Sequence, residues 1–197
     1  ISAATPGPGL VPRGLPEPFA KRTVEGDLGV RVNARAVVEL AHTHELRADL
    51  AAVLRRPEAQ ARGGLLAANT RVLAQTEEES HFDVVLASAC ADIAVERHVG
   101  HVRETYAANG PVQLLYGKDL RRVRALIGVG GVFAFGTQAA DILRACLARK
   151  ELPHSMRPEA PALFHDAGYV FYAMGLLAGR EPTMALRLLK SALVGHA

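Results

Sequence analysis

Three glycines within the segment ALIGVGGVFAFG (125–136) are the first candidate for a ligand-binding turn. A short apolar run leads into Gly128, Gly130 and Gly131, and a second apolar run leads toward 138–148. Glycine has no Cβ, so it adopts positive φ readily and lets a ligand approach the backbone. Exposed amide hydrogens at a strand-to-helix turn suit an anion or the sugar of a nucleotide. The spacing fits a plain tight turn equally well.

Two more specific phosphate-binding motifs are absent from the sequence. The dinucleotide fingerprint G-x-G-x-x-G needs a glycine at the position that Phe133 occupies. No segment supplies the P-loop pattern G-x-x-x-x-G-K-S/T. A nucleotide at this turn would therefore be held by a different arrangement.

Two carboxylates flank a glycine in the segment KRTVEGDLGVR. Glu25 and Asp27 stand where a turn is expected to open a helix. Such a pair can hold Mg²⁺ through water, or orient a water molecule for attack on a phosphate. Acidic residues also favour the start of a helix for electrostatic reasons alone, so simple capping is the competing interpretation.

The remaining polar residues predict neither a metal site nor a catalytic triad. Two histidine pairs occur at short spacing, His42 with His44 and His98 with His101. A zinc site needs a converging third ligand, and no residue in the sequence is expected to supply it. No serine lies in a nucleophile-elbow motif. We therefore expect no protein-bound metal site at the histidines.

Bulk composition describes one globular domain with an ordinary charge balance. The chain has 197 residues, of which 49% are hydrophobic and 22% charged, with a formal net charge of +3. This charge, without a basic stripe of interleaved aromatics, argues against nucleic-acid binding. No apolar run reaches the roughly 18 residues needed to cross a bilayer, so we expect no membrane association. The two cysteines fit a reduced, cytoplasmic protein.

Hydrophobic periodicity predicts a helix-rich chain with a few strands. Helices are expected over 30–42, 45–55, 57–75, 78–101, 138–150, 167–179 and 182–194, and strands over 19–24, 112–116 and 123–128. Thr76 is the expected N-cap of the longest helix, with Glu79 at the capping-box position. Strands that alternate with long helices favour an α/β or α+β arrangement.

Four blocks of sequence, in order, resemble the C-terminal half of the glutamate mutase L family. The blocks are KRTVEGDLGVR, DVVLASACADIAVERHVG, PVQLLYGKDLRRVRALIGVGGVFA and RPEAPALFHDAGYVFYAMGLLA, and the resemblance extends over 15–193. Members of this family are accessory proteins found with adenosylcobalamin-dependent mutases, and they are thought to act as reactivating ATPases. Several long blocks in a fixed order are more specific than one glycine motif.

The resemblance implies an α/β fold, namely a helix-rich, ribonuclease-H-like second lobe of an actin-like ATPase. The same superfamily includes heat-shock chaperones and sugar kinases, in which two similar lobes close on a nucleotide. The chain would then consist of a Pro/Gly-rich loop and hairpin remnant at 1–24 and the C-terminal lobe at 25–197. The lobe is expected to be incomplete, because the superfamily's phosphate loop and first lobe are not in this sequence. ATPase activity is therefore expected only together with the N-terminal half.

The resemblance also assigns roles to the residues singled out above. Glu25 and Asp27 would be the catalytic pair, near the magnesium and phosphate end of the cleft. The adenosine turn would consist of five residues, Gly128, Gly130, Gly131, Val132 and Phe133. The implied cofactors are ATP and Mg²⁺, and the implied partner is an adenosylcobalamin-dependent mutase.

Two other functions remain open at this point. A small-molecule kinase of the same superfamily would need a catalytic carboxylate aimed at a substrate hydroxyl. A non-catalytic adaptor would dock on the mutase through the apolar helices that follow Pro161, although these residues also suit a core. A sheet edge left without its strand would favour a homodimer.

Overall fold

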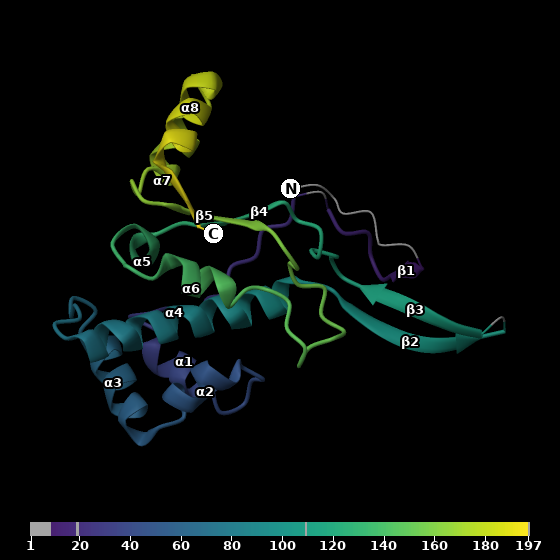
Figure 1. Ribbon diagram of the computed structural model, residues 1–197, viewed down its shortest axis with the longest axis horizontal. Coiled ribbons are helices and arrows are strands. Elements are labelled where there is room, and N and C mark those ends of the chain that lie inside the picture. Colours follow the sequence, from purple (N-terminus) through teal and green to yellow (C-terminus); the bar gives the residue numbers. More distant parts are fainter. Residues whose placement is uncertain (1–8, 19, 109, 197) are drawn as a thin grey trace.

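The computed structural model describes residues 9–18, 20–108 and 110–196, and it shows a mixed α/β chain with two small sheets. A long helix, α4 (Glu77–His98), runs across the molecule with three shorter helices on one side (Figure 1). On its other side α6 (Ala139–Arg144) separates it from a three-stranded sheet. The second sheet projects from the C-terminal end of α4 (Figure 1).

The main core lies between α4 and the three helices beneath it. These helices are α1 (Ala34–Leu40), α2 (Ala48–Leu54) and α3 (Pro57–Ala68). Their small aliphatic side chains pack with those of α4, and Phe82 is the aromatic member of the cluster. Helices α1 and α3 approach closely at Gly63, where an added Cβ would lie 3.3 Å from the carbonyl oxygen of Ala34. The scarcity of aromatic residues in the sequence is therefore matched by tight backbone packing.

The start of α4 forms as the sequence predicts. The Thr76 side chain accepts a hydrogen bond from the Glu79 amide at 3.2 Å, which is a side-chain N-cap. The Glu79 carboxylate reaches back to the Gln75 amide at 2.7 Å, one residue earlier than in a standard capping box. The capping pair thus satisfies two backbone amides at the start of the helix, one just before it and one in its first turn.

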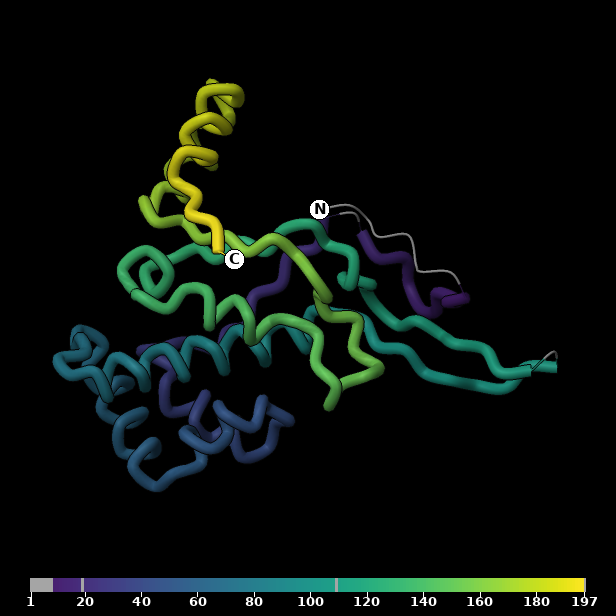
Figure 2. The backbone as a smooth tube through the Cα atoms, viewed as in Figure 1, coloured from purple at the N-terminus to yellow at the C-terminus, as the bar shows by residue number. Residues whose placement is uncertain are grey.

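The sheet that carries the glycine turn has the strand order β4-β5-β6. Strand β4 (Ala125–Gly128) runs parallel to β5 (Ala162–Asp166), with Gly128 opposite His165. Helices α5 (Gly131–Ala134) and α6 form the crossover between them, as a parallel connection requires. The chain ends beside this sheet, where β6 (Leu193–His196) pairs antiparallel with β5 (Figure 2).

The other sheet has the order β1-β3-β2 and consists of a long hairpin and one edge strand. Strands β2 (His101–Ala107) and β3 (Gly110–Tyr116) form the hairpin, which extends away from the helices (Figure 1). Strand β1 (Leu10–Arg13) lies parallel to β3 at the edge, where its proline is tolerated.

A helical hairpin projects from the far side of the β4-β5-β6 sheet (Figure 1). It consists of α7 (Phe171–Leu177) and α8 (Pro182–Ala192), and Ala185 is its one buried residue. Pro182 occupies the first turn of α8, as expected. Among the residues that the structure describes, no helix has the length and apolar character needed to span a membrane.

Several sequence predictions are corrected by the structure. The helix expected over 138–150 ends at Arg144, and the glycine turn is followed first by the four-residue α5. The strand expected over 19–24 does not form over 20–24, and Phe19 lies outside the described residues. Strands β2, β5 and β6 were not predicted, because their apolar residues do not alternate cleanly. The mixed α/β class is confirmed.

Candidate functional site

The glycine turn leaves β4 and exposes its backbone at one position. Gly130 has φ +116°, a conformation that residues with a side chain rarely adopt, and a Cβ built there would meet no atom within 4 Å. The Phe133 and Ala134 amides both donate to the Gly130 carbonyl at 3.0 Å, which fixes the turn. Gly130 therefore offers bare backbone that is open on its Cα side.

The five residues assigned to an adenosine turn divide into two groups. The ring of Phe133 lies directly over Gly128, so a side chain at Gly128 would collide with that ring. Gly128 and Phe133 therefore pack against each other within the turn. Gly130 and Gly131 face more open space, since a Cβ on Gly131 would meet only the Phe135 ring, at 3.8 Å. The half-buried Val132 lies in the short α5 between these groups.

A buried carboxylate lies at the same edge of the sheet. Asp166 ends β5, one residue beyond the partner of Gly128, and it is fully buried. Its Oδ2 atom accepts a hydrogen bond from the Phe171 amide at 2.9 Å, and Oδ1 has no hydrogen-bond partner in the described part of the chain. Buried polar atoms are rarely left without a partner. Because ligands of parallel sheets bind at the carboxyl ends of the strands, the unused acceptor and the bare glycine mark this edge as the candidate site.

The acidic turn is held by an arginine from α4. Arg97 Nη1 lies 2.7 Å from Glu25 Oε2 and 2.8 Å from Asp27 Oδ1, and Nη2 lies 2.9 Å from Asp27 Oδ2. The hydrogen bonds from Arg97 hold the pKa of Asp27 below its ordinary value, and those to Asp27 and Glu25 raise the pKa of Arg97. The turn is also closed by Asn33, which donates to the Gly26 carbonyl at 2.8 Å. Both carboxylates are therefore already paired with a cation.

The structure does not join the acidic turn to the glycine turn. The side chains of Glu25 and Asp27 form ion pairs with Arg97 of α4, whereas the glycine turn belongs to the sheet. Helix α6 packs against both α4 and the sheet, so it lies between the two layers. The bare Gly130 and the buried Asp166 both belong to the sheet layer, whereas the acidic pair belongs to the turn held by α4. The acidic pair would have to exchange Arg97 for a magnesium ion.

Two histidines are paired on the strands next to the glycine turn. His165 Nδ1 lies 2.8 Å from His196 Nε2, and the two rings are stacked with centroids 4.9 Å apart. One ring must therefore donate and the other must accept. In the part of the chain that the structure describes, no third histidine, cysteine or carboxylate completes a metal site with them or elsewhere.

We expect the pairing of β5 with β6 to weaken as the pH falls through about 6.5. Burial, and then the charge of His196, lower the pKa of His165 below its ordinary value. The unfolded chain therefore binds this proton more readily, so the stabilisation is complete above the unfolded pKa and is lost toward the folded pKa. Amide hydrogen exchange of 193–196, corrected for intrinsic rates, measures this loss. A His165→Gln variant, which lacks the titrating group, should lack the pH dependence, and equal protection in the wild type on both sides of the transition would contradict it.

A buried ion-pair network joins segments that are distant in sequence. Arg157 is 1% exposed, and its guanidinium lies 2.7 Å from Asp92 Oδ1 and 2.6 Å from Glu96 Oε2. Arg149 adds a second cation at 2.7 Å from Asp92 Oδ2, and it also bonds the Glu45 carbonyl. Burial alone would raise the pKa of Glu96, but hydrogen bonds from His101 and Arg157 outweigh it and lower the pKa. Because two cations match two carboxylates, the network is structural.

The cysteines are thiols in apolar surroundings. Burial raises the pKa of Cys90 to about 11 and that of Cys146 to about 12. Since the thiolate is the reactive form, neither is suited to nucleophilic catalysis. This leaves the carboxyl edge of β4 and β5 as the place where the described residues combine an open backbone with an unused polar atom.

Such an edge is typical of α/β proteins that bind a ligand beside a parallel strand pair. The family model described as MutL protein matches residues 2–193. Protein MutL of Clostridium tetanomorphum is 38% identical over 187 residues, which cover 95% of this chain and 40% of that relative. The chain therefore belongs to the MutL family, that is, the glutamate mutase L family. No solved structure matches the chain.

Proposed function

We propose that this chain is the nucleotide-binding lobe of an accessory protein that reactivates an adenosylcobalamin-dependent mutase. Membership of the glutamate mutase L family supports the link to a mutase. The observation that carries the nucleotide is the open, positive-φ Gly130, at the sheet edge where β5 ends in the buried Asp166. The backbone at Gly130 would lie against the nucleoside.

The chain spans about 40% of the length of the curated relative that it matches. We place the groups that bind the phosphates in the remaining part of the longer family chains, so that the nucleotide lies between two lobes. A ligand shifts a conformational equilibrium only by its different affinity for the two states. ATP and ADP would therefore drive reactivation by stabilising the closed and open lobes differently, and the closed form would release the damaged cofactor from the mutase.

Replacing Gly130 with leucine is expected to weaken ATP binding at least tenfold. The new side chain would occupy the space above the backbone, and a leucine at this φ also costs about 1–3 kcal/mol of stability. Isothermal titration calorimetry with ATP measures the change in affinity.

Gly110 provides a matched control for this variant. It has φ +111° and no atom within 4 Å of an added Cβ, but it lies in the β2–β3 hairpin. Gly110→Leu should therefore lose similar stability and keep the affinity for ATP. Unchanged affinity in Gly130→Leu would remove the glycine turn from the site and end the proposal.

A non-catalytic adaptor is the second candidate, and one observation favours it. The α7–α8 hairpin exposes large apolar side chains, namely Tyr172, Leu176, Met184, Leu186 and Leu188. Two short helices with one buried residue gain little from packing on each other alone. An adaptor would bind the mutase through this face without nucleotide. Mutase capture that is lost in Leu176→Glu, and that does not respond to ATP or ADP, would favour this function over the first.

A further inference from the structure

Three aromatic side chains lie exposed beside the glycine turn and touch one another. The centroids of Phe135 and Tyr169 are 5.8 Å apart, and those of Tyr169 and Tyr172 are 5.7 Å apart. The residues are 79%, 43% and 68% exposed, respectively. We call these three residues the aromatic platform. Its rings contact each other at inclined angles of 51° and 52°, yet leave large apolar faces in water.

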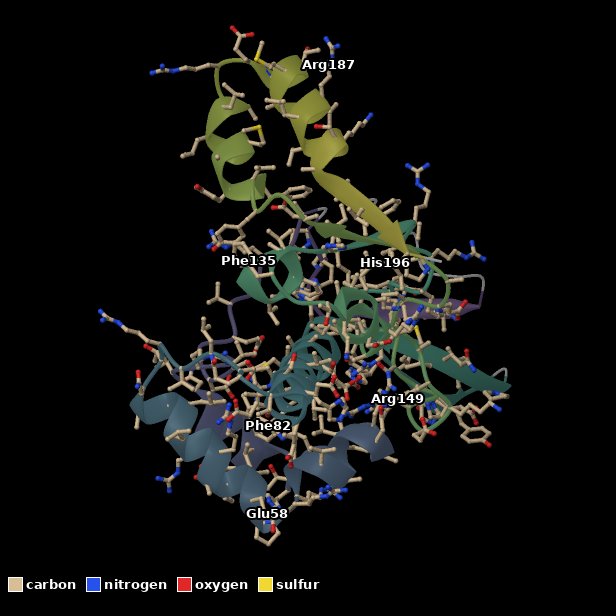
Figure 3. The ribbon with its side chains drawn as sticks, turned by 60° about the vertical axis from the view of Figure 1, so that its left-hand side comes forward. Glu58, Phe82, Phe135, Arg149, Arg187 and His196 are labelled. Carbon is tan, nitrogen blue, oxygen red and sulfur yellow. The ribbon has the colours of Figure 1, made fainter. Side chains whose placement is uncertain are left out.

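The aromatic platform and the glycine turn share one edge of the sheet. Phe135 follows α5 directly, and its ring is the nearest group to a Cβ added at Gly131. Tyr169 follows β5, the strand that pairs with β4. Figure 3 shows Phe135 beside α5, below the base of the α7–α8 hairpin. Phe135 and Tyr169 lie more than 30 positions apart in the sequence, and their rings thus meet next to the glycine turn.

Tyr169 is held in an unusual backbone conformation. Its φ is +52°, the only positive value among the non-glycine residues that the structure describes. A bulky residue in this region is a conformational outlier, and such outliers gather at functional sites. Asp166 secures the turn, because its carbonyl accepts from the Tyr169 amide at 3.4 Å and its side chain accepts from Phe171. The strained turn is what brings the Tyr169 ring between the other two.

We infer that the aromatic platform stacks the purine base of the nucleotide whose sugar lies against Gly130. This inference rests on the proposed function and adds that this chain binds the base of the nucleotide. Aromatic rings bind the flat face of a base by stacking and apolar contact. The rings carry no formal charge, so they contribute to base binding and leave the phosphates to other groups. The specificity is for a nucleoside with a large flat base.

The test compares ATP, adenosine and inorganic tripolyphosphate on the longer family protein that contains this chain, because the phosphate-binding groups are placed in its remaining part. Phe135→Ala and Tyr169→Ala should each lower the affinity for ATP and for adenosine about tenfold, which is the effect of losing one stacking contact. Binding of tripolyphosphate should stay unchanged, and Phe135→Tyr should keep the affinity of the wild type for adenosine. Tyr106→Ala is the matched control, since Tyr106 is 80% exposed but lies on β2. Titration with adenosine should also shift the ring protons of Phe135 and Tyr169 in NMR spectra.

Each result decides between the two proposals. If Gly130→Leu lowers the affinity for ATP but Phe135→Ala and Tyr169→Ala do not, the inference about the aromatic platform is overturned. The proposed nucleotide-binding function is then retained. If the wild type binds neither ATP nor adenosine, the proposed function fails, and the inference fails with it. Loss of binding to the mutase, with nucleotide affinity intact, would assign the rings to a protein interface and overturn the inference. If Tyr169→Ala does not fold, the Phe135→Ala variant alone tests the inference.

Discussion

Replacing Arg157 with methionine is expected to lower the free energy of unfolding by about 3–5 kcal/mol. The guanidinium is 1% exposed, donates a hydrogen bond to Glu96 and forms an ion pair with the side chain of Asp92. It also donates to the Ala145 carbonyl at 3.1 Å and the Asp92 carbonyl at 2.8 Å. Methionine fills a similar volume but leaves these acceptors buried without their donor. Urea denaturation followed by circular dichroism measures the loss.

The chain offers a matched control at the surface. Arg35 pairs with Glu39 on α1 at 2.9 Å, with side chains that are 68% and 52% exposed. Arg35→Met should change the free energy of unfolding by no more than about 0.5 kcal/mol, because solvent screens an exposed pair. A similar small effect in Arg157→Met would show that the buried network contributes little.

The sequence contains no signal for this network. Its carboxylates lie on the long helix, where Asp92 and Glu96 could equally have faced solvent. Their arginine partners come from segments more than 50 positions later, without regular structure of their own. Periodicity identifies which helix face is buried, but it does not show which distant loop brings an arginine to that face. For this reason the strongest electrostatic contacts were not predicted.

The same reason limits prediction of the candidate site. The glycine turn is local, so its spacing predicted a turn after β4, although only Gly130 of the three glycines has a positive φ and Gly128 is buried. The acidic turn is local too, but its cation Arg97 lies 70 positions from Asp27. Asp166 and Tyr169 were not expected at the site, because β5 itself was not predicted. Parallel pairing of β4 with β5 is the non-local step that places them beside the glycines.

The short α5 explains why the turn is better suited to a neutral group than to a phosphate. A strand-to-helix turn was expected to be followed by a helix over 138–150, whose N-terminus would attract an anion. The helix that directly follows the turn is the four-residue α5, and α6 begins near the expected start, at Ala139, but has only six residues. The aligned peptide dipoles of a long helix are therefore not available at Gly130. Open backbone and aromatic rings remain, which is why a sugar and a base are the expected occupants.

The second large effect is expected at Gly100, where two chain segments cross. A Cβ on Gly100 would lie 2.7 Å from the Tyr116 oxygen, the Gly117 carbonyl carbon and the Lys118 nitrogen. These are backbone atoms, so no side-chain rotation relieves the contact. The crossing is also fixed by hydrogen bonds, since the Gly100 amide donates to the Lys118 carbonyl at 2.7 Å and its own carbonyl accepts from Met156 at 2.9 Å.

Gly100→Ala is therefore expected to lower the free energy of unfolding by about 3 kcal/mol, at the upper end of the usual cost of overpacking. The β2–β3 hairpin and the segment that leads to β4 would separate from the end of α4. Gly64 in α3 is the matched control, because an added Cβ there meets no atom within 4 Å. Gly64→Ala should raise the stability by about 0.5–1 kcal/mol through helix propensity. Equal stability of Gly100→Ala and the wild type in urea would mean that the two segments do not cross as closely as the structure places them.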